Sequence, residues 1–181
     1  MKWFNHSIVA TAVILPIAPY YLPFAIAGST APDWIEMVMN STKSVGYIKH
    51  RTLTHILSHW LLAAIITGLI FFLFDMKLFA VIMWFAIGGL SHVVADMLSG
   101  NGVPVSPYSL RPSHLFGARI PCGSPVEYYI AFTLLGCSLF VAYNVHGGSE
   151  EFFPFFYYWA GMYEDGVIDG FEWRKYRFNF I

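Results

Sequence analysis

The sequence has few charged residues, and this shortage excludes two broad classes of protein. Only 12% of its 181 residues are charged, whereas 57% are hydrophobic, and the mean hydropathy is +0.57. These values lie outside the usual range of soluble domains, so we expect an integral membrane protein. The formal net charge is −1, and the ten Lys and Arg residues are scattered. No basic face is therefore available for nucleic acid, and no nucleic-acid binding is expected.

Other motifs are also missing. The two cysteines, Cys122 and Cys137, have neither C-x-x-C spacing nor the spacing of paired ligands, so we interpret them as free thiols. No G-x-S-x-G motif occurs, which argues against a serine hydrolase. The N-terminal apolar run has prolines and bulky aromatic residues where a secretory signal has a small-residue cleavage site. We therefore expect this run to remain in the mature protein.

Three segments have the length and polarity of membrane-spanning helices. They are residues 56–74, 78–98 and 126–145, each close to the roughly 20 residues that a bilayer core requires. Only three residues, "DMK", separate the first two segments. These two are therefore predicted to form a tight antiparallel hairpin.

A fourth apolar run, residues 7–27, is interrupted by Pro16, Pro19 and Pro23. Proline removes a backbone hydrogen bond and kinks a helix, so we expect two short helices instead of one span. A helix over residues 6–15 would rise about 15 Å, which is half the thickness of the hydrocarbon core. The chain would then turn and leave on the side where it entered. Such a re-entrant hairpin over residues 6–32 would bring His6 to the same face as Asp33.

The predicted fold is all-α: an integral membrane helical bundle with about three spanning helices and an N-terminal, proline-broken, re-entrant helical hairpin. We expect one membrane-embedded domain over residues 1–181. Its parts are the re-entrant hairpin 6–32, the helical hairpin 56–98, an irregular loop 99–125 at the rim of the site, the last spanning helix 126–145 and an aromatic tail 146–181. The tail suits packing at the membrane interface and is a candidate surface for a protein partner.

His92 and Asp96 stand out because they lie near the end of an otherwise apolar predicted span. They are four residues apart, so on a helix they share a face and can both point at one ion. Ionisable residues inside a membrane are costly and usually functional. This segment alone supports two interpretations equally well. His92 and Asp96 either bind a metal ion, or they form a buried hydrogen-bonded pair or a proton relay.

A second group of histidines lies in "KHRTLTHILSHW". His50 and His55 are too far apart in angle to share one helix face, so His50 is expected to precede a helix whose first turn holds His55, with Thr52 as a candidate N-cap. His59 is a weaker candidate ligand. Arg51 either binds an anionic group such as phosphate or anchors the membrane interface.

Two carboxylates fall at the polar edge of the same predicted face, Asp33 after the proline-broken run and Glu127 at the start of the last span. As isolated residues they are more often helix caps or solvated charges. Together with imidazoles they supply the mixed nitrogen and oxygen donors that zinc and similar cations prefer. The candidate metal ligands are His6, Asp33, His50, His55, His92, Asp96 and Glu127. Seven ligands exceed one tetrahedral site, so the site would hold two or more ions if all of them bind.

The same motifs resemble the YdjM family of inner-membrane proteins, described as membrane-bound metal-dependent hydrolases and distantly similar to zinc-dependent phospholipase C. The likeness runs through "HSIVATA", "APD", "HRTLTH", "LSHVVADMLSGNGVPV" and "GSPVEYY", over residues 5–145. It implies that His6, His50 or His55, His92, Asp96 and Glu127 are metal ligands, and that Asp33 is a ligand or the carboxylate that orients the attacking water. The family usually has a second aspartate where this chain has Ile35, with Glu36 as a possible substitute.

From these residues and this resemblance we expect a multi-pass protein of the bacterial inner membrane that acts as a metal-dependent hydrolase. Its cofactor would be a divalent cation, most often zinc in such sites, and metal-activated water would cleave a phosphoester or a related bond. A site at the membrane surface suits a lipid substrate. The alternative is a non-catalytic membrane assembly protein that retains a structural metal site.

Overall fold

The computed structural model describes residues 1–42, 49–146 and 163–177, and most of these residues are helical. The predicted tail 146–181 lies largely outside the described residues. The helices are α1 (Trp3–Ile14), α2 (Leu22–Thr42), α3 (Leu57–Phe74), α4 (Lys77–Asp96), α5 (Pro125–His146) and α7 (Gly170–Arg177). Three single 3-10 turns are η1 (Pro19–Tyr21), η2 (Leu53–His55) and η3 (Leu115–Gly117).

The three predicted spans are confirmed as long apolar helices. Within the described part of the chain, α3, α4 and α5 are long and apolar enough to cross a membrane. Their ends fall within one or two residues of the predicted ends. Many large side chains on α3, such as Leu62, Leu69 and Phe72, point outward from the bundle. A helix that faces hydrocarbon can expose such side chains without cost.

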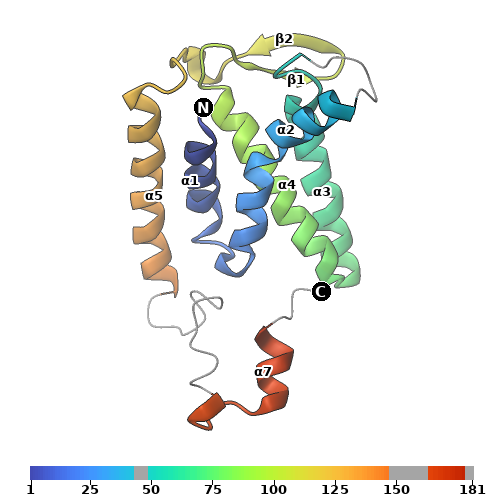
Figure 1. The fold of residues 1–181 in the computed structure, drawn as a ribbon, viewed down its shortest axis with the longest axis vertical. Helices are drawn as coiled ribbons and strands as arrows, with labels where there is room; N and C mark the ends of the chain where they lie inside the picture. The colour runs from blue at the N-terminus through green and yellow to red at the C-terminus, as the bar shows by residue number, and fades with distance from the viewer. Residues whose placement is uncertain (43–48, 147–162, 178–181) are drawn as a thin grey trace.

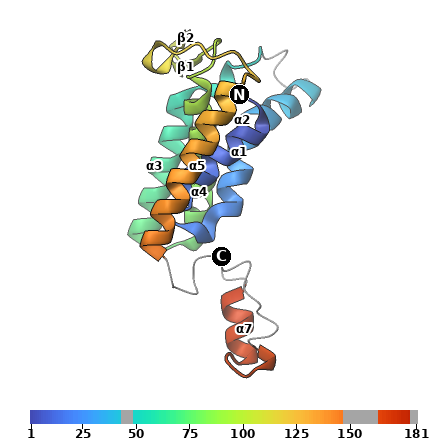
Figure 2. The ribbon, with the colours of Figure 1, turned by 90° about the vertical axis from the view of Figure 1, so that its left-hand side faces the viewer.

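Helix α4 is the centre of the bundle, because it packs against α2 on one side and α3 on the other, and α1 packs against α2, α4 and α5. Figures 1 and 2 show α1 to α5 side by side along the long axis of the molecule. Glycines allow α2 and α4 to approach closely. A Cβ atom added to Gly28 would lie 1.9 Å from the carbonyl oxygen of Phe85, and one added to Gly88 would lie 2.1 Å from that of Ala25. Small residues at such crossings are typical of helices packed in membranes.

The proline-rich N-terminal run reverses direction, as its prolines predict. Helix α1 ends at Ile14, and α2 begins at Leu22 with Pro23 in its first turn, where the missing N–H has no intrahelical partner to lose. Helix α2 then continues through Pro32 to Thr42 and is longer than the predicted hairpin 6–32 allows. Figure 1 shows α1 and α2 joined near the end of the bundle opposite the N-terminus. The re-entrant position of this hairpin in a bilayer stays a prediction.

The loop 99–125 contains a small β-hairpin, so the prediction of an all-α fold with an irregular rim loop was wrong at this point. Strands β1 (Val103–Ser106) and β2 (Ser109–Ser113) pair antiparallel, with Val103 opposite Ser113 and Ser106 opposite Ser109. Gly102 precedes β1 with a φ of +61°, and a Cβ there would lie 2.6 Å from the Ser113 carbonyl oxygen. The hairpin lies across the end of the bundle that holds the N-terminus (Figure 1).

Candidate metal centre

His92 on α4 lies at the centre of the candidate site and is fully buried. Its Nδ1–H donates a hydrogen bond of 2.6 Å to the backbone carbonyl oxygen of Ser29 on α2. A carbonyl oxygen only accepts hydrogen bonds, so Nδ1 carries the proton and the neutral ring keeps its lone pair on Nε2. Metal-binding histidines are commonly oriented by such a second hydrogen bond. Nε2 of His92 lies 3.7 Å from Oδ2 of Asp96.

His6 on α1 completes a first group with His92 and Asp96. The imidazole rings of His6 and His92 are stacked, with centroids 3.6 Å apart and an angle of 13° between their planes. Nε2 of His6 lies 3.4 Å from Oδ1 of Asp96. The reversal between α1 and α2 therefore brings His6 to the cluster that also holds Asp33.

A second group contains Asp33, His55 and His92. Oδ1 of Asp33 lies 3.2 Å from Nε2 of His55 and 3.8 Å from Nε2 of His92. Burial by itself raises the pKa of Asp33, but the close imidazoles of His55, His92 and His6 outweigh burial and lower this pKa to about 2. The Asp33 carboxyl group is therefore ionised at neutral pH and available as a ligand.

A third group contains Glu36, His50 and His55. Nδ1 of His50 lies 3.0 Å from Oε1 of Glu36, and Nδ1 of His55 lies 3.7 Å from Oε2 of the same carboxylate. Asp33 and Glu36 are three residues apart on α2 and so share a face. The three groups overlap, since His92 belongs to the first and second groups and His55 to the second and third.

The turn that carries His55 differs from the sequence prediction. His55 ends η2, Ile56 is extended, and α3 begins only at Leu57, so Thr52 is not the N-cap of that helix. The Thr52 hydroxyl instead donates to the carbonyl oxygen of Lys49. Because the chain bends before α3, His55 points at α2 and α4 and not along the helix that follows it.

Arg51 turns its guanidinium into the cluster and not toward an interface. Its side chain is 9% exposed, and its terminal nitrogens bind Oδ1 of Asp96, at 3.0 Å, and the hydroxyl of Ser99. Its backbone has a φ of +62° and donates an N–H to Oε2 of Glu36. This strained conformation is held by the two carboxylates and fixes a positive charge beside the cluster.

Glu127 lies next to these groups but in none of the three. It is 1% exposed on the first turn of α5, and its Oε2 accepts hydrogen bonds from the Gly123 amide, at 3.0 Å, and from the side-chain amide of Asn5, at 3.4 Å. Its Oε1 has no hydrogen-bond partner and lies 3.9 Å from the amino nitrogen of Met1. The remaining six predicted ligands all belong to the three groups.

The chemistry of the donor atoms fits a divalent cation. Five buried atoms of the three groups make no hydrogen bond: both ring nitrogens of His6, Nε2 of His55 and of His92, and Oδ1 of Asp33. Buried polar atoms nearly always have a partner, and a set of neighbouring exceptions calls for an explanation such as an ion. Imidazole nitrogen and carboxylate oxygen together suit zinc, manganese or iron. The structure thus supports one or more metal sites without identifying the metal.

Sequence reasoning gave Glu36 only as a possible substitute and missed Asn5, Ser29 and Ser99. The three-residue spacing from Asp33 is the signal that places Glu36 in the site. Ser29 acts through its backbone carbonyl, which no residue pattern marks. Asn5 and Ser99 contact Glu127 and Arg51 respectively, and only the packing of distant segments brings them there.

Comparison with known proteins identifies a family for this chain. The family model described as "YdjM inner membrane protein" matches residues 1–166, which is most of the chain. No curated protein and no solved structure matches.

Proposed function

Because the chain belongs to the YdjM inner membrane protein family, we propose that it is a membrane-embedded, metal-dependent hydrolase that uses zinc to cleave a phosphoester or related bond. The proposed metal ligands are His6, Asp33, His50, His55, His92, Asp96 and Glu127. The observation that carries this proposal is the set of five buried nitrogen and oxygen atoms, from His6, Asp33, His55 and His92, that have no hydrogen-bond partner. They come from separate segments of the chain and point into one cluster.

A divalent cation held by these residues would lower the pKa of a water molecule towards about 7 and polarise a phosphoryl oxygen. Asp33 is ionised and close to two imidazoles, so its carboxylate is suited to accept a hydrogen bond from that water and to orient it. Arg51 supplies a fixed guanidinium beside the cluster, a group that recognises phosphate oxygens well. His92 and Asp96 both lie on α4, so this helix fixes their positions relative to each other.

The position of the site supports an amphiphilic substrate. Asp96 is the last residue of α4, one of the candidate spans, so the cluster lies near the end of an apolar helix. In a re-entrant arrangement, α1 and α2 would enter and leave the membrane on this same side. A lipid would then meet the site with its polar head at the membrane surface and its hydrocarbon chains among the helices.

Burial favours a second candidate function, a structural metal site in a non-catalytic assembly protein. His6, His55 and His92 are fully buried, and only the third group has an exposed member, His50. The family's usual second aspartate is also replaced by Ile35. Metal-loaded protein that binds stoichiometric metal but cleaves no member of a panel of lipid and nucleotide phosphoesters would favour this function over hydrolysis.

Replacement Asp33→Asn tests the catalytic proposal. We expect hydrolysis of a phosphodiester by the metal-loaded protein to fall at least about 10²-fold, because asparagine does not replace the carboxylate that orients the attacking water. Asparagine keeps one oxygen donor, so at least half of the bound metal should remain, as measured by elemental analysis. Asp75→Asn is the control, because Asp75 lies in the turn between α3 and α4 in a left-handed conformation that asparagine tolerates. Unchanged activity in Asp33→Asn would exclude this role for Asp33.

A further inference from the structure

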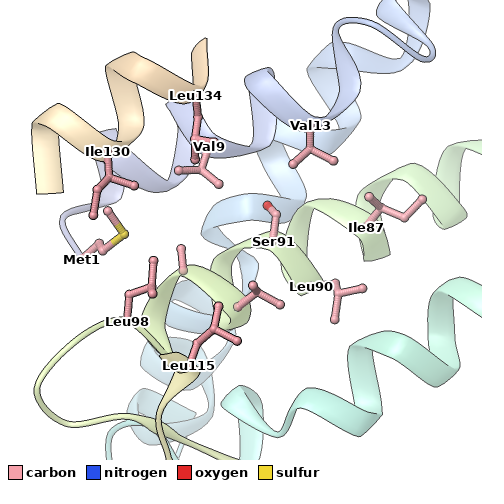
Figure 3. Close-up of a pocket in the computed structure, with 12 residues that line it drawn as sticks. Met1, Val9, Val13, Ile87, Leu90, Ser91, Leu98, Leu115, Ile130 and Leu134 are labelled. Atoms are coloured by element: carbon pink, nitrogen blue, oxygen red, sulfur yellow. The ribbon is translucent and has the colours of Figure 1, made fainter. Parts of the chain in front are cut away.

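An apolar groove lined by residues of α1, α4 and α5 runs beside the cluster. It has a volume of about 390 Å³, which is within the range of about 300–1,000 Å³ of small-molecule sites. Figure 3 shows the side chains that line it, among them Val9 and Val13 from α1, Leu90 from α4, and Ile130 and Leu134 from α5. Ser91 is the one polar side chain among the lining residues, and its hydroxyl already donates to the carbonyl oxygen of Gly88.

The groove is closed at its floor and open at its lip. Val9 and Ala95 at the floor are 8% and 4% exposed, whereas Val13 and Leu134 at the lip are 40% and 46% exposed. Two exposed lining residues, Val94 on α4 and Leu134 on α5, belong to candidate membrane spans, whereas α1 is a shorter apolar helix. The groove therefore opens towards the hydrocarbon region of a bilayer.

The inner wall of the groove is continuous with the candidate metal centre. Ser91 and Ala95 line the groove, and the residues that follow each of them on α4, His92 and Asp96, belong to the cluster. Met1 lines the groove as well, and its amino nitrogen lies 2.5 Å from Oδ1 of Asp96. The end of the groove formed by Met1 and Ala95 therefore lies beside Asp96.

We propose that this groove binds one hydrocarbon chain of a phospholipid and so presents the lipid's phosphoester to the cluster. The cleavage of the lipid rests on the proposed function, but the binding of its hydrocarbon chain in the groove can be tested separately. A hydrocarbon chain needs no hydrogen-bond partner, whereas an inserted peptide segment would leave backbone groups unsatisfied against these apolar walls. The positively charged groups nearest the cluster are the amino group of Met1, which lines the groove, and the Arg51 guanidinium, which is paired with Asp96; a phosphate would have to compete with Asp96 for them.

Retention of a lipid through purification tests the binding of the chain. The protein is extracted from nanodiscs of palmitoyl-oleoyl phosphatidylglycerol into a mild detergent and measured by native mass spectrometry. The wild type should retain one lipid per chain, and Leu134→Trp, which fills the lip, should lower this retention at least tenfold. Leu139→Trp is the matched control, because Leu139 lies on the same helix, is 45% exposed and does not line the groove. This control should retain the lipid.

Val13→Trp fills the same lip from α1 and should repeat the loss if Leu134→Trp fails to fold. A wild type without retained lipid, or equal retention in Leu134→Trp and Leu139→Trp, would overturn the proposal. A second copy of the chain that occupies the groove in place of lipid, seen as a dimer that Leu134→Trp dissociates, would overturn it too.

Hydrolysis separates this proposal from the proposed function. In Leu134→Trp, the ratio of the rate on phosphatidylglycerol to the rate on the water-soluble bis(p-nitrophenyl) phosphate should fall at least tenfold, and in Leu139→Trp it should not change. Equal loss of both rates in Leu134→Trp would contradict a role in holding the lipid chain. If the wild type cleaves neither substrate while lipid retention still depends on Leu134, the proposed hydrolase function fails and the lipid groove stands.

Discussion

His92→Ala should weaken metal binding more than any other single replacement in the cluster, by more than about 100-fold. His92 is the one histidine that contributes to the two most buried groups, and its Nε2 faces both Asp33 and Asp96. Loss of an outer partner of a metal ligand costs about 10–100-fold in affinity, so loss of a shared ligand should cost more. Elemental analysis of purified protein, followed by titration with zinc after removal of bound metal, measures the effect.

His59→Ala is the matched control for this experiment, because His59 is an exposed histidine on α3 that belongs to none of the three groups. It should bind metal as the wild type does. His50→Ala should affect only the third group and leave metal at the other two. A His92→Ala protein that keeps its helical circular dichroism and its full metal content would rule out the proposed centre.

Gly88→Ala should destabilise the bundle strongly, by about 3 kcal/mol, the upper part of the usual range for overpacking. The new Cβ would lie 2.1 Å from the carbonyl oxygen of Ala25 and 2.9 Å from the amide nitrogen of Ser29, both of them backbone atoms that cannot rotate away. Helices α2 and α4 would have to separate. Because Ser29 orients His92 across this contact, metal affinity should fall together with the thermal unfolding temperature in detergent.

Gly136→Ala provides the comparison, since no atom lies within 4 Å of a Cβ at this position on α5. Alanine is favoured over glycine in a helix by about 0.5–1 kcal/mol, so this protein should be slightly more stable than the wild type. If both alanine proteins unfold at the same temperature, the close contact of α2 with α4 does not determine stability.

The spans could be predicted because length and apolar composition determine them almost alone. The reversal of the N-terminal run was also predictable, since Pro16, Pro19 and Pro23 prevent one continuous helix. The C-terminal end of the hairpin was not predictable, because packing against α4 lets α2 continue through Pro32. The β-hairpin was missed since its strands are short and proline-containing, and Pro104 even pairs with Pro112.

Within the site, the spacing of residues along one helix could be used for prediction. Contacts between segments distant in the sequence could not be predicted. The four-residue step from His92 to Asp96 is enough to predict that both side chains share one face of α4. The position of His55 depended on a bend that replaces the predicted cap at Thr52, and that bend depends on contacts with Glu36. The hydrogen bond from His92 to the Ser29 carbonyl had no signal in the sequence at all.

The order of the ligands along the chain has a consequence for biosynthesis. His6 leaves the ribosome early, but the imidazole on which it stacks, His92, follows only after α2 and α3 have been made. The polar side chains of α1 and α2 that belong to the cluster therefore lack their partners on α4 until α4 has been made. A metal bound as we propose would be captured only when α4 docks, and its binding free energy would then contribute to the assembly of the bundle.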